Sequence, residues 1–387
     1  MRPEQAGNKI PVGLRTIIAG GATGGHLFPG IAIAENIRQQ SPGSAVLFIS
    51  TGTDLEKRVL PKTGFDFAVI PTEGIKGRSL TAGVRAIVKL GRGMVTAAGL
   101  IKKFSPDVIV GVGGYSSAPV IISGWIMGVR IALHEQNALP GVSNRWLARF
   151  ADQIFISLAP AAGWFPAGKV QLTGNPVRQD ILRAANRRSN RSGSNDHRFT
   201  VLILGGSQGA GGINRAVVAA LGHLDDKKRY FFVHQTGAAD EDLVRRAYRH
   251  HGVDCRVKPF FDDMPEQYTG ADFLICRAGA TTVAEIISLG KVALLVPFPH
   301  AADNHQTFNA RALTEADGAE MIQEKDLTGE ILAEKIIRYA DNPRRLEEMS
   351  GRVRSLGDPR AGRRVAEECL AMAGRPRKKR AMIYACI

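Results

Sequence analysis

A glycine-rich stretch near the N-terminus, GGATGGHLFPG at residues 20–30, constrains the fold of this chain more than any other feature. The apolar run before it, 16–19, predicts a short buried strand, and the apolar residues Ile31, Ala34 and Ile37 after it recur at helical spacing. Glycines at such a strand-to-helix turn let a phosphate approach the backbone, and the N–H groups that open the helix point at that anion. His26 stands at the start of the helix. The alternative is a tight turn that binds nothing.

Apolar runs and helical patterns alternate from residue 15 onward, which predicts an α/β fold with parallel sheets and crossover helices. A second series opens as the first does, because the apolar run 199–204 leads into the glycine-rich stretch 205–212 and then a helix. Polar residues 184–198 interrupt the pattern and predict a surface loop near a domain junction. The predicted strands are 16–19, 45–49, 67–70, 108–112, 131–134, 153–156, 200–204, 230–234, 255–258, 273–276 and 293–296.

The 387 residues are enough for two domains, each with its own core. We expect an N-terminal domain over 14–178 joined by a C-terminal helix at about 356–373, a second domain over 179–355, and a basic tail over 374–387. The longest apolar stretch, 118–129, is too short to span a bilayer, and the first residues lack the apolar core of a signal peptide. The four cysteines are scattered without a CxxC pair, which indicates a reducing compartment and neither a zinc site nor a disulfide frame.

The formal net charge of +15 admits nucleic acid, an anionic membrane or a phosphorylated substrate as partner. Between Glu73 and Asp107 the chain has no acidic residue but seven basic ones, interleaved with apolar residues. That composition is typical of a helix lying on an anionic bilayer, and a surface helix with a solvated basic face is the alternative. The residues expected to contact the membrane are Ile75, Lys76, Arg78, Leu80, Arg85 and Lys89.

Further motifs follow predicted strands. GVGGYSSAP at 111–119 is another glycine-rich turn that could line an anion site, and HEQN at 134–137 places four polar residues at a strand end. Arg178 follows GNPV at 174–177, and its planar guanidinium suits a diphosphate because it donates two hydrogen bonds at once. The stretches PFPH at 297–300 and DNHQ at 303–306 make another polar loop after a predicted strand.

The stretch CRAGATTVAE at 276–285 predicts a strand end, a turn and a helix start. Thr281 or Thr282 is expected to cap this helix, which places Glu285 in its first turn. Glu285 has two open interpretations. It is either a capping-box acid favoured by the helix dipole, or a carboxylate that accepts both hydroxyls of a ribose.

Eight motifs stand in one order along the chain: GGATGGHLFPG, GVGGYSSAP, HEQN, GNPVR, GGSQGA, FFDDM, CRAGATTVAE and DNHQ. Together, over roughly residues 14–372, they resemble the MurG family, the UDP-N-acetylglucosamine:N-acetylmuramyl-(pentapeptide) pyrophosphoryl-undecaprenol N-acetylglucosamine transferases. The resemblance implies a GT-B fold, two Rossmann-like parallel-sheet domains that face each other across a cleft. It also implies transfer of N-acetylglucosamine from UDP-GlcNAc to the C4 hydroxyl of the muramyl sugar of undecaprenyl-linked lipid I, giving lipid II and UDP with inversion.

The same resemblance implies roles for individual residues. Gly24, Gly25, Gly113, Gly114 and Tyr115 would hold the acceptor diphosphate. Glu285 would hold the ribose, Phe261 the uracil through its backbone, and Ser207 and Arg178 the donor diphosphate. The full donor-binding set is Thr23, Gly24, Gly25, Asn137, Arg178, Ser207, Phe261, Ala280, Thr281, Thr282, Val283, Ala284, Glu285 and Gln306.

An inverting transfer benefits from a general base that removes the proton of the attacking hydroxyl. His26 is the candidate by residue type and position, and His134 is the alternative. The acidic string 240–242 opens an amphipathic helix, so we expect no metal and no cofactor, and helix N-termini with Arg178 stabilise the leaving UDP. A UDP-GlcNAc 2-epimerase of the same fold is the alternative function. A nicotinamide dehydrogenase needs another glycine spacing, and a nucleic-acid binder leaves the eight motifs unexplained. We expect a peripheral protein on the cytoplasmic face of the bacterial plasma membrane, with other cell-wall enzymes as possible partners.

Overall fold

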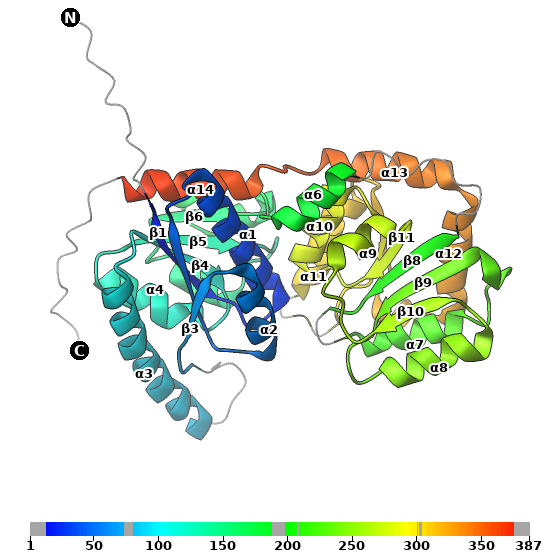
Figure 1. The fold of residues 1–387 in the computed structure, drawn as a ribbon, viewed down its shortest axis with the longest axis horizontal. Coiled ribbons are helices and arrows are strands. Elements are labelled where there is room, and N and C mark those ends of the chain that lie inside the picture. The colour runs from blue at the N-terminus through cyan, green and yellow to red at the C-terminus, as the bar shows by residue number, and fades with distance from the viewer. Residues whose placement is uncertain are drawn as a thin grey trace, which may run out of the picture. The chain divides into compact units, whose positions relative to one another are not determined.

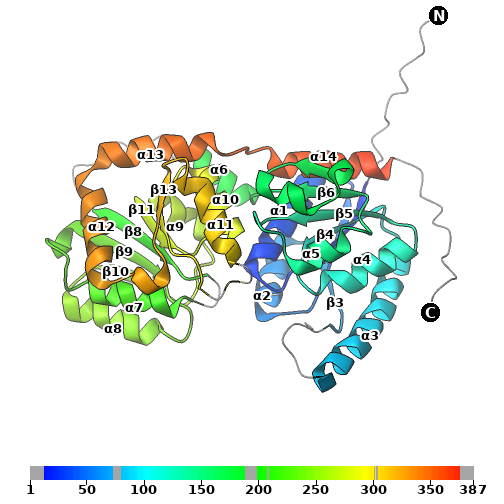
Figure 2. The ribbon, with the colours of Figure 1, turned by 180° about the vertical axis from the view of Figure 1, so that it is seen from behind.

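The computed structural model describes residues 13–72, 80–187, 198–206, 209–299, 301 and 304–374, with backbone alone at 80–88 and 186–187. The chain divides into two compact units. Unit 1 comprises residues 1–176 and 360–387, and unit 2 comprises residues 177–359. Each unit is a parallel sheet covered by helices on both faces, as Figures 1 and 2 show from opposite sides. The prediction of an α/β fold with two Rossmann-like parallel sheets is therefore confirmed.

Unit 1 is built on seven parallel strands in the order β3-β2-β1-β4-β5-β6-β7. Their bounds are β1 Arg15–Gly20, β2 Ala45–Ser50, β3 Asp66–Val69, β4 Val108–Gly113, β5 Arg130–Glu135, β6 Gln153–Ile156 and β7 Val170–Leu172. The helices are α1 Gly24–Gln40, α2 Asp54–Thr63, α3 Leu80–Phe104, α4 Ser117–Ile126, α5 Val142–Leu147 and α14 Ala361–Ala373, with the 3₁₀ helices η1 Ala159–Trp164 and η2 Ala167–Lys169.

Side chains alternate between the two faces of this sheet, because successive residues of a strand point in opposite directions. Ile17 and Ile109 belong to a buried cluster with residues of α3, α4 and α5. Ile18 points to the other face, where α1 approaches so closely that a Cβ at Gly30 would lie 3.0 Å from the Ile18 side chain. The C-terminal helix α14 packs on α1, and Gln40 donates a hydrogen bond to the Arg363 carbonyl at 2.9 Å. The end of the chain thereby completes the first unit.

Unit 2 has six parallel strands in the order β10-β9-β8-β11-β12-β13. They are β8 Phe199–Leu204, β9 Tyr230–Gln235, β10 Cys255–Lys258, β11 Phe273–Cys276, β12 Val292–Leu295 and β13 Ala319–Met321. The helices are α6 Gln179–Arg187, α7 Gly211–Ala220, α8 Glu241–His251, α9 Met264–Gly270, α10 Ala280–Leu289, α11 His305–Thr314, α12 Gly329–Asp341 and α13 Pro343–Ser355, with η4 Lys227–Arg229 and η6 Glu324–Asp326. One buried cluster joins α7, α8 and α12 to the sheet, and a second joins α6, α9, α10 and α11.

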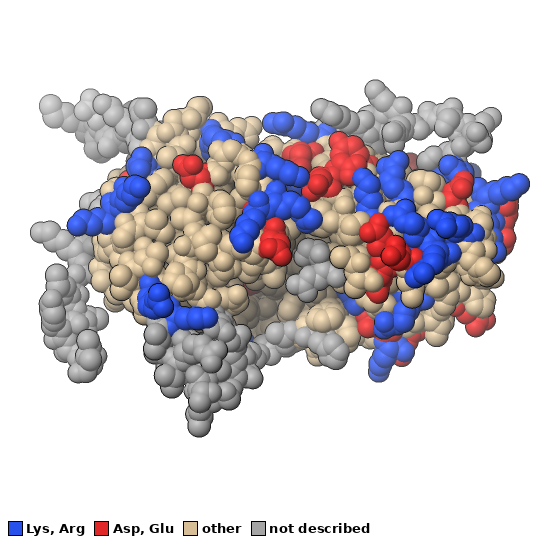
Figure 3. Space-filling view, turned by 60° about the horizontal axis from the view of Figure 1, so that its bottom comes forward, with Lys and Arg blue, Asp and Glu red and all other residues tan. Residues whose placement is uncertain are grey.

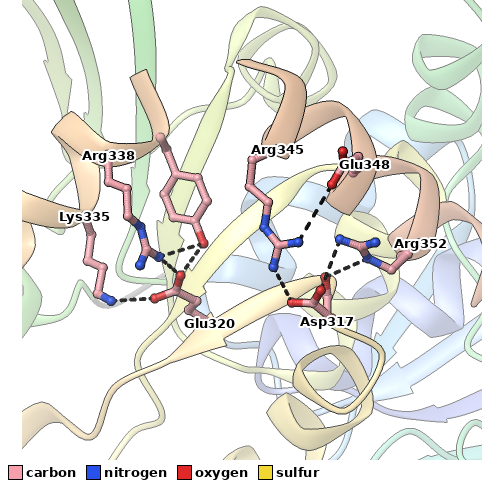
Figure 4. Close-up of polar contacts among 8 residues, drawn as sticks. Asp317, Glu320, Lys335, Arg338, Arg345, Glu348 and Arg352 are labelled. Carbon is pink, nitrogen blue, oxygen red and sulfur yellow. Dashed lines mark hydrogen bonds and ion pairs between the residues drawn. The ribbon is translucent and has the colours of Figure 1, made fainter. Parts of the chain in front are cut away.

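Ion pairs fasten the last strand of unit 2 to two helices (Figure 4). Glu320 of β13 pairs with Lys335 of α12 at 2.8 Å and also with Arg338. Asp317, just before β13, pairs with Arg345 of α13 at 2.6 Å and with Arg352 at 3.1 Å. These side chains are partly exposed, so each pair contributes about 0–1 kcal/mol at most.

The structure departs from the predicted elements at three places. It contains two strands that the sequence pattern did not predict, β7 and β13, each of only three residues. The predicted polar loop over 184–198 was wrong at its start, because α6 continues to Arg187, and residues 188–197 lie outside the described part.

Within the described residues, no helix is both long and apolar enough to cross a membrane.

Candidate active site

Two glycine-rich turns of unit 1 meet at the carboxyl edge of its sheet. β1 and β4 are neighbours, and Gly20 pairs with Gly113 where both strands end. A Cβ at Gly20 would lie 2.3 Å from the Gly113 carbonyl oxygen, so the backbones touch in a way that only glycine allows. α1 begins at Gly24 with no side chain capping it, and α4 likewise has no side-chain cap. Two uncapped helix N-termini therefore open at one edge, an arrangement that favours anions.

His26 lies against the second of these turns. A Cβ at Gly113 would lie 2.8 Å from Cδ2 and 2.9 Å from Nε2 of the imidazole, so no larger residue fits there without moving the ring. Nδ1 lies 3.2 Å from the Thr23 hydroxyl oxygen. A hydrogen bond from Nδ1–H to that hydroxyl would place the accepting lone pair of the neutral ring on Nε2. The structure thus brings Thr23, Gly24, Gly25, Gly113 and His26 together. Gly114 and Tyr115, the latter 43% exposed, continue the second turn.

His134 is buried at the end of β5, and both of its ring nitrogens have partners. The Gln136 side-chain amide donates to Nδ1 at 3.1 Å, and Nε2 faces the Gly174 carbonyl at 3.5 Å. Burial lowers the pKa of His134 to about 4, the Gly174 carbonyl opposes that shift, and the neighbouring His26 adds to it. A neutral imidazole with both nitrogens engaged is a poor proton acceptor, so the geometry favours His26 over His134 as the base.

Glu135 organises the turn after β5. Its buried carboxylate accepts hydrogen bonds from the backbone and side-chain N–H groups of Asn137 and from the Gly141 N–H, at 2.9, 3.1 and 3.2 Å. The side-chain amide of Asn144 donates to it at 2.8 Å. Burial raises the pKa of Glu135, and these donors oppose that shift. The predicted donor contact Asn137 is therefore held from behind by Glu135.

Three polar atoms around the second glycine turn are buried and bonded to no other described residue: Ser116 Oγ, Gln136 Oε1 and Asn144 Oδ1. Gln136 also donates to the Val112 carbonyl at 2.9 Å, and the Asn144 amide nitrogen would lie 3.6 Å from a Cβ at Gly113. Buried polar atoms without a partner are uncommon in proteins, and at this edge they are available to a polar ligand. Sequence reasoning missed Asn144 because it lies in a short helix, seven residues beyond the end of the HEQN motif.

In unit 2 the glycine turn after β8 is braced by Gln235, another residue that sequence reasoning missed. Its side chain donates to the Gly206 carbonyl at 2.9 Å and accepts the Phe261 N–H at 3.0 Å. Phe261 is buried, and its N–H is already hydrogen-bonded to Gln235. Only its carbonyl is then left as the backbone group for the predicted contact with uracil. Ser207, predicted to meet the diphosphate, lies outside the described residues.

Glu285 lies in a buried network with Arg178 and Tyr268. The Tyr268 hydroxyl donates to one carboxylate oxygen at 2.8 Å, and the Arg178 guanidinium lies 3.5 Å from the other. Burial raises the pKa of Glu285, while Arg178 and the Tyr268 hydroxyl oppose that shift. Tyr268 gave no signal in the sequence, because it lies 17 residues away on α9 and meets Glu285 only through the fold.

The predicted cap of α10 was wrong. The helix begins at Ala280 after Gly279, and no side chain caps it, so neither Thr281 nor Thr282 has that role. Glu285 is consequently the sixth residue of α10, beyond the first turn, which excludes the capping-box interpretation. Ala280 through Ala284 form the uncapped first turns of the helix. Gln306 lies in α11, and its side-chain oxygen accepts the Phe298 N–H at 2.9 Å.

The remaining predicted residues are placed only in part. Leu80 and Arg85 lie in α3 where the backbone alone is described, Lys89 is half-buried in the same helix, and Ile75, Lys76 and Arg78 lie outside the described residues. The acidic string 240–242 opens α8, as expected. The described part of the chain holds no group of three or more His, Cys, Asp or Glu side chains suited to a metal ion.

Comparison with known proteins matches both halves of the chain to one family. Residues 16–156 match the glycosyltransferase family 28 N-terminal domain, and residues 200–364 match the family's C-terminal domain. A UDP-N-acetylglucosamine–N-acetylmuramyl-(pentapeptide) pyrophosphoryl-undecaprenol N-acetylglucosamine transferase of Myxococcus xanthus is 42% identical over 358 residues, 92% of each chain.

Two solved structures are informative in different ways. The crystal structure of MurG from Acinetobacter baumannii superposes with a TM-score of 0.71 at 29% identity, covering 92% of this chain and 98% of that one. A UDP-GlcNAc 2-epimerase from Neisseria meningitidis superposes with a TM-score of 0.64, over 93% of this chain and 99% of that one, at 13% identity. The epimerase shares the fold alone.

Proposed function

The chain belongs to glycosyltransferase family 28, in the branch of the N-acetylglucosaminyltransferases named above, and on that basis we propose its reaction. It transfers N-acetylglucosamine from UDP-GlcNAc to the C4 hydroxyl of the muramyl sugar of lipid I, giving lipid II and UDP with inversion at the anomeric carbon. The observation that carries this proposal is the 42% identity over 92% of both chains. The 13% identity to an epimerase gives no comparable support to the alternative.

Unit 1 is the acceptor-binding unit in this proposal. The uncapped N-termini of α1 and α4, with the glycines at 24, 25, 113 and 114, bind the acceptor diphosphate through backbone N–H groups. His26 removes the proton of the C4 hydroxyl through Nε2, with Nδ1 oriented by the Thr23 hydroxyl. His134 supports the site from within the core and does not act as the base.

Unit 2 binds the donor. The carboxylate of Glu285 accepts the ribose hydroxyls, and Tyr268 and Arg178 keep that carboxylate oriented. Each carboxylate oxygen has a second lone pair in addition to the one these partners use. The uncapped start of α10 and the Arg178 guanidinium stabilise the diphosphate as UDP departs, which is an electrostatic contribution made without a proton transfer.

The acceptor carries a long lipid, so the enzyme works at a membrane, and we assign that contact to the basic and apolar segment 74–106. In α3, Val95 is 76% exposed while Ala97 and Ile101 are buried, so one side of the helix packs on unit 1 and another faces outward. Figure 3 shows a face of unit 1 that is mostly uncharged, whereas Lys, Arg, Asp and Glu mix over unit 2. The location that follows is peripheral, on the cytoplasmic face of the plasma membrane, where other cell-wall enzymes act on the same lipids.

A direct assay tests the reaction. The protein is incubated with radiolabelled UDP-GlcNAc and a short-chain lipid I analogue, and the products are separated. We expect labelled disaccharide product and an equal amount of UDP, with the β-anomer formed from the α-linked donor. Release of free 2-epimerised sugar without dependence on the acceptor would instead identify an epimerase.

A further inference from the structure

The turn between β1 and α1 has a backbone conformation that L-residues seldom adopt. Gly20, Gly21 and Ala22 have φ of +117°, +147° and +65°, and Ala22 has a Cβ that makes the left-handed region unfavourable. Thr23 N–H donates back to the Gly21 carbonyl at 2.8 Å. Something outside the turn must therefore hold it, because the turn has a short internal bond and an unfavourable residue.

Glu56 of α2 is that external contact. One carboxylate oxygen accepts the Ala22 N–H at 2.7 Å, and the other accepts the Thr53 N–H, also at 2.7 Å. The side chain is fully buried. A Cβ at Gly21 would lie 2.1 Å from Oε1, the oxygen that accepts the Ala22 N–H. The carboxylate therefore fills the space that a side chain at position 21 would need. Glu56 thus joins the turn after β1 to the turn after β2.

One oxygen of Glu56 closes a capping box with Thr53. The Thr53 hydroxyl accepts the Glu56 N–H, and Glu56 returns a bond to the Thr53 N–H, which fixes the first turn of α2. A capping box needs one oxygen of the acid. The second oxygen is then presented to the neighbouring turn, and the charge makes its bond to the Ala22 N–H stronger than a neutral one.

His26 lies in the first turn of α1, directly after the β1–α1 turn. Ala22 and Thr23 lead directly into α1 at Gly24, and the imidazole occupies a narrow space beside Gly113. A displacement of the start of α1 moves the ring with it. Misplacement of a catalytic group by about 1 Å can lower a rate by about 10²-fold.

We propose that Glu56 is a positioning residue for the transfer reaction, which holds the β1–α1 turn so that His26 meets the acceptor hydroxyl. The proposal rests on the proposed function, because it requires His26 to act on the acceptor hydroxyl. Glu56 itself is fully buried, so the proposal gives it no contact with the substrates.

The first test compares Glu56→Gln with the native enzyme. A glutamine offers one acceptor oxygen for two backbone N–H groups, so one of the two bonds is lost. We expect kcat to fall by about 10-fold or more. The affinity for UDP, measured by calorimetry, is expected to change less than kcat, because Arg178 and Glu285, the residues proposed to hold the diphosphate and the ribose, lie in unit 2. If Glu56→Gln does not fold, Glu56→Asp, which keeps the charge but shortens the reach, is measured for the same effect.

A double-mutant cycle separates positioning from a general structural role. If Glu56 acts through His26, Glu56→Gln lowers kcat by less than about 2-fold in a His26→Ala background. Equal losses in both backgrounds overturn the inference and leave the proposed function standing, as does native kcat in Glu56→Gln when His26→Ala is impaired. Native kcat in His26→Ala refutes both the base assignment and the role of Glu56. An absence of any transfer by the native enzyme refutes the proposed function.

Two further variants complete the design. Thr53→Ala removes the hydroxyl that caps α2 but leaves the Glu56–Ala22 bond, so it lowers thermal stability without lowering kcat. Ala22→Gly in the Glu56→Gln background removes the Cβ that disfavours φ of +65°, and we expect it to restore part of the lost kcat. A loss of kcat in Thr53→Ala equal to that in Glu56→Gln would show that only helix stability matters.

Discussion

The guanidinium of Arg178 lies 3.5 Å from the carboxylate of Glu285, with both side chains largely buried within unit 2. Removal of one partner of such a buried ion pair strongly destabilises the folded protein, because the charge of the other partner stays buried without compensation. Burial raises the pKa of Glu285, and the charge of Arg178 opposes that shift. The pair therefore links the residue proposed for the ribose to the residue proposed for the diphosphate.

The first prediction concerns this network. Tyr268→Phe removes a hydrogen bond to Glu285 while keeping the ring, so we expect UDP-GlcNAc affinity to fall by about 0.5–1.5 kcal/mol. Glu285→Ala removes the acceptor itself and is expected to weaken binding by roughly 1–3 kcal/mol. Titration calorimetry measures the affinity of both variants for UDP and for pyrophosphate, which lacks the uridine. An affinity for UDP that stays native in Glu285→Ala, with only the melting temperature lowered, would remove Glu285 from the donor site.

The second prediction concerns the base. His26→Ala is expected to lower kcat by about 10²-fold or more while UDP still binds, because general base catalysis contributes about 10²–10⁴-fold. His134→Gln, which keeps a polar side chain in the buried position, is expected to retain more activity than His26→Ala. Single-turnover rates of the two variants are compared with the short-chain acceptor. The reverse order of activities would transfer the role to His134.

The third prediction concerns acid stability. Burial lowers the pKa of His134 to about 4 and that of His234 to about 3, so below the unfolded value near 6.5 the unfolded chain binds protons that the folded chain does not. The contribution of these two histidines to the free energy of unfolding is fully present above pH 6.5. It falls as the pH drops toward 4, by roughly 1.4 kcal/mol per pH unit for each histidine. The raised pKa values of Glu135 and Glu285 act in the opposite direction.

Because the contributions of these four groups overlap, the test compares the pH dependence of unfolding between variants. Urea unfolding from pH 7 to pH 5 is compared between the native protein and His234→Asn, with His250→Asn, an exposed residue of α8, as the control. The slope of unfolding free energy against pH should be shallower in His234→Asn alone. Identical slopes in all three proteins would contradict the neutral state of the buried imidazole.

The fourth prediction concerns the membrane. Changing Lys76, Arg78, Arg85 and Lys89 to Gln is expected to release the protein from anionic vesicles, since each cation near the surface contributes about 1 kcal/mol. Transfer to a short-chain soluble acceptor should remain largely intact. The matched control changes Lys227, Lys228, Arg246 and Arg249 of unit 2 to Gln, with the same change in charge. Equal binding of both variants would contradict the assignment, and if that binding weakens with salt it would point to the basic tail after Gly374.

The fold was predictable where patterns are local. Apolar runs of four to six residues with glycine-rich turns identified the interior strands of both sheets, whereas β7 and β13 are three residues long and too short for periodicity to mark. The start of α10 was predicted wrongly because the helix begins after Gly279, without a capping side chain. That shift changed the interpretation of Glu285.

The site was predictable where motifs carry it and unpredictable where tertiary contacts do. Tyr268, Gln235 and Asn144 reach the proposed site residues from other elements, and no local pattern shows which partner each will meet. Glu56 was the exception, since Thr53 and Glu56 have capping-box spacing that could have been read from the sequence. The second contact of Glu56, to Ala22, needed the packed sheet.

The strands at the borders of the two sheets have a consequence for how the protein behaves in a crowded cell. β3, β7, β10 and β13 have only three or four residues each, whereas β1, β4, β8 and β9 have six. Short border strands that carry charges such as Arg256, Lys258 and Glu320 give another polypeptide little length to add to, because a growing sheet needs several consecutive backbone bonds. The architecture thereby discourages edge-to-edge aggregation at the places where an open parallel sheet is most exposed to it.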